Sequence, residues 1–338
     1  MLKILYWSCG VYLLISTVWF LFFRIRAQHQ PIQVLSWSSN LMPPSIRTIK
    51  AITWNISRCR GLESSIDPWK GGRPSERLDR AHEIGKFLLK HEVDLVFLNE
   101  VDFGSSWSGG IDHSELIAIA GKFPYLIKQW NENFSIPFLR IQGGSAILSR
   151  LPLIEATYQE LPNPTGFQRW LFGYYNPWSD VQKKWKNEIA SEPQYGIRGC
   201  AVVRLNVPEC SPIYVTTLHM PSRSKLIQKA TVERLLEIQR NNQGGWIIGG
   251  DVNLTPTHSL DLNQKNALDF LLSEGGFQID FFALENPKAF SFPTVSPRIA
   301  IDWIMGTVPM ELHDQKSLKS ELSDHLPVFV NIVINPMH

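Results

Sequence analysis

Polar side chains able to bind a cation or transfer a proton recur at the ends of apolar runs in this 338-residue chain. They occur in or just after the runs ITWN, LVFLNE, YVTTLH, WIIGG and AIDWI, and just before the last apolar run of the chain. The set consists of Asn55, Glu100, His219, Asp251, Asn253, Asp302, Asp324 and His325. Carboxylates and imidazoles are the usual acids and bases of enzymes. Each alone has a plain structural explanation, as a turn residue, a cap or a buried ion-pair partner. The recurrence of one placement favours a shared site.

The elements that must position these residues are short β-strands alternating with amphipathic helices. β-Branched apolar runs predict strands at 49–54, 95–100, 145–149, 201–205, 213–218, 246–250, 301–305 and 328–334. Apolar residues at helical spacing predict helices at 75–91, 222–240 and about 260–274. Strands and helices in these numbers imply packed layers of an α/β or α+β fold, in which strand ends meet at one edge and build a site.

Composition excludes several classes of protein. The chain is 44% hydrophobic and 19% charged, which is typical of a globular protein and not of a disordered one. Four cysteines are too few to cross-link a chain of this length, and no Cys/His cluster has the spacing of a zinc site. Residues 1–26 contain three basic residues and no acidic one, so the remainder carries 30 basic against 31 acidic residues. Binding to nucleic acid through phosphate contacts is therefore not favoured by charge.

The N-terminal run of residues 4–23 contains no charged residue. Twenty helical residues span about 30 Å, the thickness of a bilayer's hydrocarbon core, so the run predicts a single-pass membrane anchor within residues 1–26. A cleaved signal peptide covering residues 1–27, which would give a secreted protein, is the alternative. Basic residues flank both ends of the run, so the side of the membrane stays open. Residues 27–48 are predicted to be a linker to a catalytic domain over 49–338.

A segment rich in aromatic residues, 163–196, separates two predicted strands. Its aromatic residues include Trp170, Phe172, Tyr174, Tyr175, Trp178 and Trp185. Two interpretations are open: a surface excursion whose rings pack on the core, or a flap that covers the site or touches lipid headgroups.

The order of the segments WN, LNE, GGSAILSR, TLH, GGDVN, IDWI and SDH resembles the endonuclease/exonuclease/phosphatase superfamily. That superfamily includes deoxyribonuclease I, apurinic endonucleases, inositol-polyphosphate 5-phosphatases and neutral sphingomyelinases. The resemblance runs from about Ile49 to Ile334, and GGDVN followed by SDHLPV is its most specific part. It implies a four-layer sandwich of two mixed β-sheets packed face to face, with helices outside.

The resemblance also implies a role for each site residue. Glu100, Asn55 and Asp324 correspond to residues that hold Mg²⁺, a hard ion that prefers oxygen ligands and for which Mn²⁺ is a possible substitute. Asp251 corresponds to the general base or water-orienting carboxylate, and Asn253 to a residue that positions the phosphate or water. Asp302 corresponds to the acid that orients His325, and His325 to a group that contacts the phosphate or exchanges a proton.

His219 discriminates within the superfamily, because apurinic endonucleases have tyrosine at the comparable place. The division of acid and base roles between His219 and His325 stays open. We expect a membrane-anchored, Mg²⁺-dependent phosphodiesterase acting on a lipid or small molecule. A deoxyribonuclease I-like nuclease acting on DNA or RNA is the alternative, and a non-catalytic scaffold is disfavoured because every motif residue is present. The sequence shows no obligate protein partner.

Overall fold

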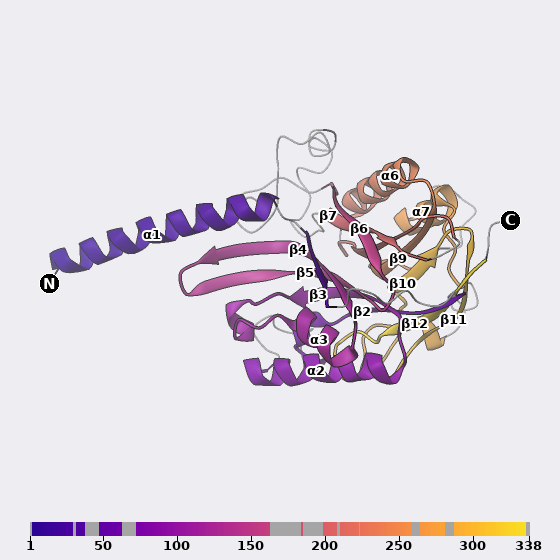
Figure 1. Cartoon of the computed structure of the whole chain (residues 1–338), viewed down its shortest axis with the longest axis horizontal. Helices are drawn as coiled ribbons and strands as arrows, with labels where there is room; N and C mark the ends of the chain where they lie inside the picture. The colour runs from indigo at the N-terminus through magenta and orange to yellow at the C-terminus, as the bar shows by residue number, and fades with distance from the viewer. Residues whose placement is uncertain are drawn as a thin grey trace.

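The computed structural model describes residues 2–29, 32–37, 47–62, 72–162, 184, 199–207, 210–222, 224–257, 264–280 and 287–335. Two β-sheets pack face to face, and helices cover both outer faces (Figure 1). The predicted fold class of two packed mixed sheets flanked by helices is confirmed. The aromatic segment 163–196 lies outside the described residues apart from Lys184, so neither interpretation of it is tested.

The first sheet has seven strands in the order β1-β4-β5-β3-β2-β12-β11. Their bounds are β1 Ile32–Ser36, β2 Thr48–Asn55, β3 Leu95–Asp102, β4 Tyr125–Ile136, β5 Leu139–Ser149, β11 Met310–Ser317 and β12 Val328–Ile334. β2 and β3 are parallel, and the other neighbours are antiparallel. Helices α2 (Pro74–Lys90) and α3 (His113–Gly121) cover the outer face of this sheet, where Leu88 and Ile117 pack with Trp54.

The second sheet has five strands in the order β10-β9-β8-β7-β6. Their bounds are β6 Leu153–Glu160, β7 Gly199–Leu205, β8 Ile213–His219, β9 Gly245–Asp251 and β10 Asp302–Gly306. Only the β8–β9 pairing is parallel within the described residues. Helices α6 (Lys225–Asn241) and α7 (Ala267–Gly275) cover its outer face, where Leu235 and Leu271 pack against Trp303. α6 begins after Ser224, whose hydroxyl accepts a hydrogen bond from the backbone of Ile227 and caps the helix.

The space between the sheets is filled by the inward side chains of the predicted strands. Phe97 of β3, Ile247 of β9 and Val330 of β12 belong to one buried cluster and are fully shielded from solvent. Three short 3-10 turns, η1 (Ser57–Cys59), η3 (Ser106–Ser108) and η5 (Pro287–Ala289), occur in the described connections. The two sheets are therefore held at a fixed distance, which allows side chains from both to meet at one edge.

Helix α1 (Leu2–His29) contains the run predicted as a membrane anchor. Within the part of the chain that the structure describes, no helix is both long and apolar enough to cross a membrane. The prediction of a single-pass anchor at residues 4–23, and of a membrane location, is therefore wrong. The apolar run is diluted by serine, threonine, tyrosine and tryptophan, which are less hydrophobic than the aliphatic residues of typical spans.

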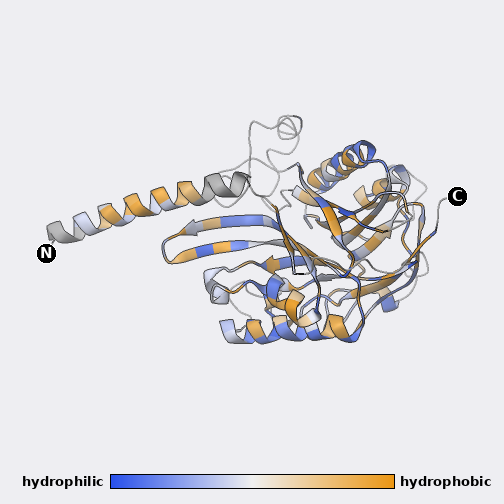
Figure 2. Cartoon of the chain, in the orientation of Figure 1, coloured by the Kyte–Doolittle hydropathy of each residue, from blue (hydrophilic) through white to orange (hydrophobic). Residues whose placement is uncertain are grey.

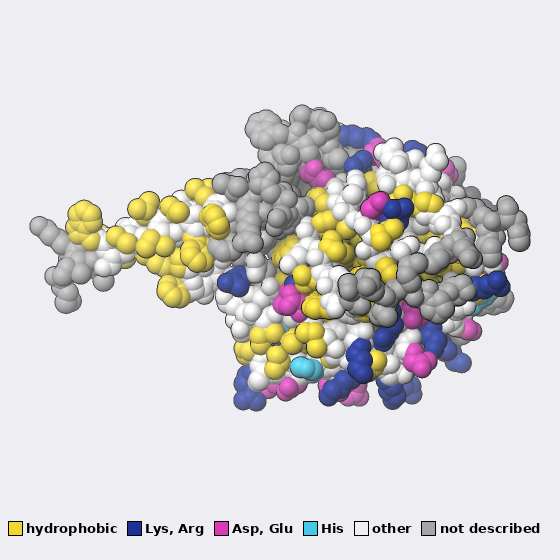
Figure 3. All heavy atoms as spheres, in the orientation of Figure 1, with side chains coloured by type: hydrophobic (Ala, Val, Ile, Leu, Met, Phe, Trp, Pro, Cys, Tyr) yellow, Lys and Arg dark blue, Asp and Glu magenta, His cyan; other side chains and the backbone are white. Residues whose placement is uncertain are grey.

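α1 instead lies along the β4–β5 hairpin, and both extend away from the sandwich (Figure 1). The Tyr12 hydroxyl donates to the carbonyl of Pro137 at 3.3 Å, and Trp19 Nε1 donates to Ser135 Oγ at 3.2 Å. Apolar side chains remain exposed along this helix (Figures 2 and 3). β1, which pairs with β4, lies within the segment 27–48 predicted as a linker.

Candidate active site

The eight predicted site residues come from both sheets and converge at one edge of the sandwich. Parallel pairing of β8 with β9 places His219 opposite Asp251, and antiparallel pairing of β9 with β10 places Asp251 opposite Asp302. β2 ends at Asn55, the pairing partner of Asn99 in β3, and Glu100 follows that residue. The strand ends thus meet as the sequence predicts.

Asn55 connects the two halves of the site. Its Nδ2 donates to Glu100 Oε1 at 3.2 Å and to Asp251 Oδ2 at 3.1 Å. Its Oδ1 accepts a hydrogen bond from the backbone of Ser57 at 3.0 Å, which fixes the orientation of the amide. One side chain of the first sheet therefore joins a carboxylate of each sheet.

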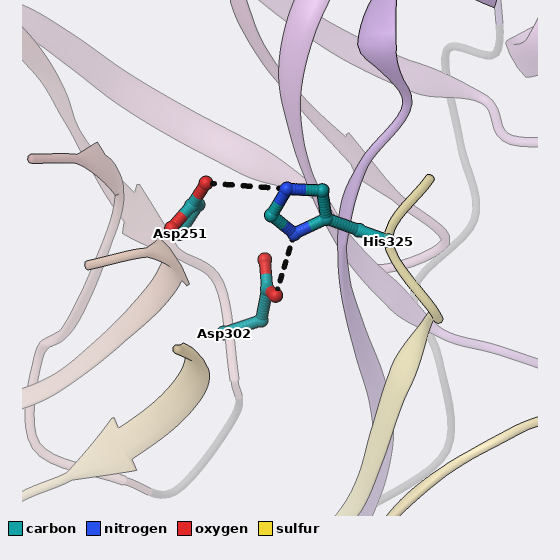
Figure 4. Close-up of side chains that lie close together, drawn as sticks. All are labelled: Asp251, Asp302 and His325. Atoms are coloured by element: carbon teal, nitrogen blue, oxygen red, sulfur yellow. Dashed lines mark hydrogen bonds and ion pairs between the residues drawn. The ribbon is translucent and has the colours of Figure 1, made fainter. Parts of the chain in front are cut away.

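His325 lies between two carboxylates, as Figure 4 shows. Its Nδ1 is 2.9 Å from Asp302 Oδ2, and its Nε2 is 3.8 Å from Asp251 Oδ2. The imidazole is buried, and Trp54 Nε1 donates to the backbone carbonyl of His325 at 2.9 Å. The ring is therefore held by its own backbone and by Asp302, with Nε2 facing Asp251.

His219 and Asn253 also contact Asp251. His219 Nε2 lies 3.7 Å from Asp251 Oδ2, and the backbone of Asn253 donates to Asp251 Oδ1 at 3.0 Å. The amide of Asn253 donates to the carbonyl of Met220 at 2.8 Å. Asp251 thus has both histidines on one oxygen and a backbone donor on the other.

The Asp324 carboxylate is linked to the other site residues through Ser323. The hydroxyl of Ser323 lies 2.7 Å from the carbonyl of Asn55 and 3.3 Å from Asp324 Oδ1. This serine ties the loop that carries Asp324 and His325 to the end of β2. Among the described residues, Ser323 is the hydrogen-bond link between the Asp324 carboxylate and the rest of the site.

Burial and neighbouring charges shift the pKa values of three site residues. Burial, reinforced by the charge of Asp302, raises the pKa of Asp251 to about 6, although both histidines oppose the shift. Burial alone would lower the pKa of His325, but the charge and hydrogen bond of Asp302 outweigh it and raise the value to about 10. Burial tends to raise the pKa of Glu100, but His219, Arg58, Asn55 and Arg60 together lower it. At neutral pH the site therefore combines a cationic His325 with an Asp251 poised to accept a proton.

The backbone is strained on the Glu100 side of the site. Glu100 has φ of 51° at a bulge in the β3–β5 pairing, and Ser57, Arg58 and Cys59 have φ of 47°, 53° and 56°. Residues other than glycine rarely adopt this conformation. Such strain is typical of functional sites, where the surrounding structure holds the backbone in place.

The donor set of the site suits a hard divalent cation. Within the described residues, ligand atoms of Asp251, Asp302 and His325 lie within 4.8 Å of one another, whereas the predicted metal carboxylates Glu100 and Asp324 are not part of this cluster. Asp302 Oδ1 is buried without a hydrogen-bond partner, and the Glu100 carboxylate is 29% exposed beside the Asn55 amide. Carboxylate oxygens in a partly open site are the ligands that Mg²⁺ and Mn²⁺ prefer.

Sequence reasoning missed several residues that position the site. Asn99 is fully buried, and its Oδ1 accepts from the backbone of Asp251 at 2.8 Å, while its Nδ2 donates to Ser145 and Thr217. Its presence in the LNE run beside Glu100 was the available signal. Ser323 likewise immediately precedes Asp324. The importance of Arg58 and Arg60 depends on the strained turn after Asn55, for which the sequence gives no comparable signal.

Comparisons with known proteins agree with this geometry. The profile of the Endonuclease/Exonuclease/phosphatase family matches residues 52–325. A family member from Beutenbergia cavernae has a similar structure, with a TM-score of 0.59 and 17% identity over 86% of this chain and 72% of that chain. No curated protein sequence matches the chain.

Two further solved structures share the fold. A mannosyl-6-phosphatase of Bacteroides thetaiotaomicron has a TM-score of 0.55 and 14% identity over 85% of this chain and 100% of its own. The human Nocturnin catalytic domain, with a bound sulfate anion, has a TM-score of 0.54 and 14% identity over 91% of this chain and 98% of its own.

The chain belongs to the Endonuclease/Exonuclease/phosphatase family. Members of this family are divalent-metal-dependent phosphoesterases, nucleases and phosphatases. The predicted family, and the prediction of a metal-dependent hydrolase of ester bonds, are confirmed.

Proposed function

We propose that this protein is a Mg²⁺-dependent phosphodiesterase acting on a small-molecule or lipid phosphodiester. The observation that carries the proposal is the pair of hydrogen bonds from Asn55 to Glu100 and Asp251, since they unite a cation-binding carboxylate with an acid–base group. The near balance of 33 basic and 31 acidic residues favours a small substrate over a long polyanion.

Glu100, Asn55 and Asp324 are the residues that would hold the cation. The Glu100 carboxylate offers oxygens beside the Asn55 amide, and the negative charge it keeps at neutral pH suits a divalent ion. When bound, the ion would supply Lewis-acid stabilisation of the negative charge on the phosphoryl oxygens.

Asp251 serves as the base that takes the proton from the attacking water. Its pKa of about 6 leaves it ionised at neutral pH yet basic enough to accept a proton. The backbone of Asn253 holds Asp251 Oδ1 at 3.0 Å, so Oδ2 is the oxygen directed toward the two histidines and Asn55. Asn253 contributes to placing the phosphate or water through the loop that its amide fixes.

His325 stabilises the negative charge that develops on the non-bridging phosphoryl oxygens. Asp302 keeps the imidazole charged and fixes Nε2 toward the reacting centre. His219, which is 26% exposed, is the group placed to meet the leaving oxygen, and its share of proton transfer with His325 stays open.

Hydrolysis of bis(p-nitrophenyl) phosphate by the purified full chain tests this proposal. We expect turnover with Mg²⁺ that EDTA abolishes, and losses of about 10²- to 10⁴-fold in Asp251→Asn, His219→Ala and His325→Ala. Arg204→Gln is the matched control, because Arg204 forms a partly exposed ion pair with Glu155, away from the site residues. Turnover that survives EDTA, or survives all three substitutions, would contradict the proposal.

A nuclease of the deoxyribonuclease I type is the second candidate, favoured by the two arginines beside Glu100. On the face shown in Figure 3, however, the Lys and Arg side chains of the described residues are interspersed with Asp and Glu. Assays of DNA, RNA, sphingomyelin and phosphoinositides with Mg²⁺ and with chelator discriminate the two. Salt-sensitive cleavage of DNA or RNA, with no hydrolysis of the lipids, would favour the nuclease.

A further inference from the structure

Two arginines, Arg58 and Arg60, lie close enough to Glu100 to lower the pKa of its carboxyl. Arg60 Nη2 is 3.5 Å from Glu100 Oε2, and its Nε and Nη2 donate to the carbonyl and hydroxyl of Ser57. The Arg60 side chain is only 11% exposed. The guanidinium is therefore fixed and directed by the strained turn after Asn55.

Arg58 is fixed in a different way. Its Nη2 donates to Glu132 at 2.7 Å, and its guanidinium lies over the ring of Trp107, 5.5 Å from the centroid. Trp107 is in turn held by Asp102, which accepts from its Nε1 at 2.6 Å. Arg58 Nη1 is buried and has no hydrogen-bond partner in the described part of the chain. A buried guanidinium donor without an acceptor is costly, and the Arg58 side chain as a whole is 21% exposed, so part of this guanidinium can be reached by an oxygen ligand.

Charge around the turn favours an anion as that ligand. Arg77 is 3% exposed, with Nε and Nη1 unpartnered among the described residues, and it lies close enough to repel both Arg58 and Arg60. Asp102 already accepts hydrogen bonds from Trp107 and two backbone amides. If Glu100 is engaged by a divalent cation, Arg60 loses its ion-pair partner. Arg58, Arg60 and Arg77 then face two remaining carboxylates, Glu132 and Asp102, so positive charge is in excess around the turn.

We propose that Arg58 and Arg60 form an anion subsite that binds a second phosphate group of the substrate, next to the phosphodiester that is cleaved. The inference rests on the proposed function and narrows the substrate class to phosphodiesters that carry an additional phosphate. Guanidinium groups suit this ligand because their planar donors match phosphate oxygens. The ring of Trp107 forms the wall behind Arg58.

The test compares two esters that differ by one phosphate: the p-nitrophenyl ester of thymidine 5′-phosphate, with and without an additional 3′-phosphate. We expect the wild-type protein, with Mg²⁺, to prefer the bisphosphate by about 10- to 100-fold in kcat/KM, as charge-assisted hydrogen bonds predict. Arg58→Gln and Arg60→Gln should each reduce this ratio to about threefold or less. Arg204→Gln should leave it unchanged.

Glu132→Gln should change the preference for the bisphosphate in the opposite direction to Arg58→Gln. The substitution removes the negative charge that competes with a phosphate for Arg58 Nη2, so the preference for the bisphosphate should increase. If the Arg58–Glu132 pair had only a structural role, Arg58→Gln and Glu132→Gln would instead change the ratio of kcat/KM values in the same direction. Equal kcat/KM values for the two esters in wild type, or a ratio that no variant changes, would overturn the subsite.

A binding measurement separates this proposal from the proposed function. Calorimetry should show that thymidine 3′,5′-bisphosphate binds about 10-fold or more tightly than thymidine 5′-monophosphate, and that Arg58→Gln removes the difference. If the bisphosphate binds more tightly but neither ester is hydrolysed, the result would contradict the proposed activity and support the subsite. Hydrolysis of both esters with equal nucleotide affinities would support the activity and overturn the subsite.

Discussion

Asp302→Asn should convert His325 from a permanently charged group into one that titrates near neutral pH. The pKa of His325 is raised from 6.5 to about 10, which corresponds to about 5 kcal/mol in favour of the charged imidazole. Among the groups that raise it, Asp302 ranks first through its charge and its hydrogen bond of 2.9 Å, ahead of Asp251 and Asp324. Burial disfavours the charged imidazole, so the pKa of His325 should fall once Asp302 is replaced by a neutral residue.

The sign of the pH dependence follows directly. In wild type, His325 remains charged until the pH approaches 10, so its contribution to kcat/KM should be constant from pH 6 to 9. In Asp302→Asn the charged fraction should decrease through this range. The activity of the variant relative to wild type should therefore fall by about 10- to 100-fold between pH 6 and pH 9.

Two measurements check this expectation. The first is the ratio of kcat/KM values of variant and wild type, determined across pH at saturating Mg²⁺ so that effects on the substrate and ion cancel. The second is titration of the His325 imidazole by NMR in the metal-free protein. Glu311→Gln is the control, because it removes the carboxylate of an exposed pair with His313. A constant ratio together with an unchanged His325 titration would refute the role assigned to Asp302.

Two further predictions concern Asp251 and Asn99, the buried residue that holds the Asp251 backbone. Asp251→Asn should stabilise the metal-free protein by roughly 3 kcal/mol at pH 8, because the raised pKa of about 6 means that the fold disfavours ionised Asp251. The stability that the Asp251 carboxyl contributes is fully present below its ordinary pKa of 3.8 and is lost as the pH rises through 6. The melting temperatures of wild type and Asp251→Asn, measured in EDTA, should therefore diverge over that pH range. A constant difference between the two melting temperatures would contradict this prediction. Asn99→Ala should destabilise the protein by about 2 to 4 kcal/mol, since it leaves the backbone amide of Asp251 without its acceptor, and should lower kcat about 10-fold. Denaturant unfolding and steady-state kinetics test this, and a change in stability alone would remove Asn99 from the set that positions Asp251.

The sequence predicted the central strands well because they are buried on both faces. These strands contribute side chains both to the buried cluster between the sheets and to those under the helices, so their apolar runs are almost uninterrupted. They are β2, β3, β8, β9 and β10. β1, β4, β6 and β11 were missed. The second half of β4 alternates with polar residues in the hairpin, and β11 is an edge strand with an irregular register. Local composition cannot identify such strands, because their pairing partners supply much of their stability.

The apolar run in α1 led to the wrong prediction of a membrane anchor for a related reason. Length and absence of charge are properties of the helix alone and do not depend on what it contacts. The ring of Phe20 lies 5.8 Å from that of Phe134, and Trp19 donates to Ser135, so the β4–β5 hairpin supplies partners for one side of the helix. A sequence window contains no information about such a partner more than a hundred positions away.

The site itself was predictable in its residue types but not in its backbone. Motif order identified the polar residues at strand ends, whereas the left-handed conformations at Ser57, Arg58, Cys59 and Glu100 leave no trace in residue type, since none is glycine or asparagine. Hydrogen bonds hold this backbone: Cys59 donates to the carbonyl of Ile56, and the backbone of Ser57 donates to the Asn55 side chain. The same amide then reaches Glu100 and Asp251. The strained turn and the junction of the two sheets are therefore one connected unit, and a change that relaxes the turn should displace the two arginines and the cation-binding carboxylate together.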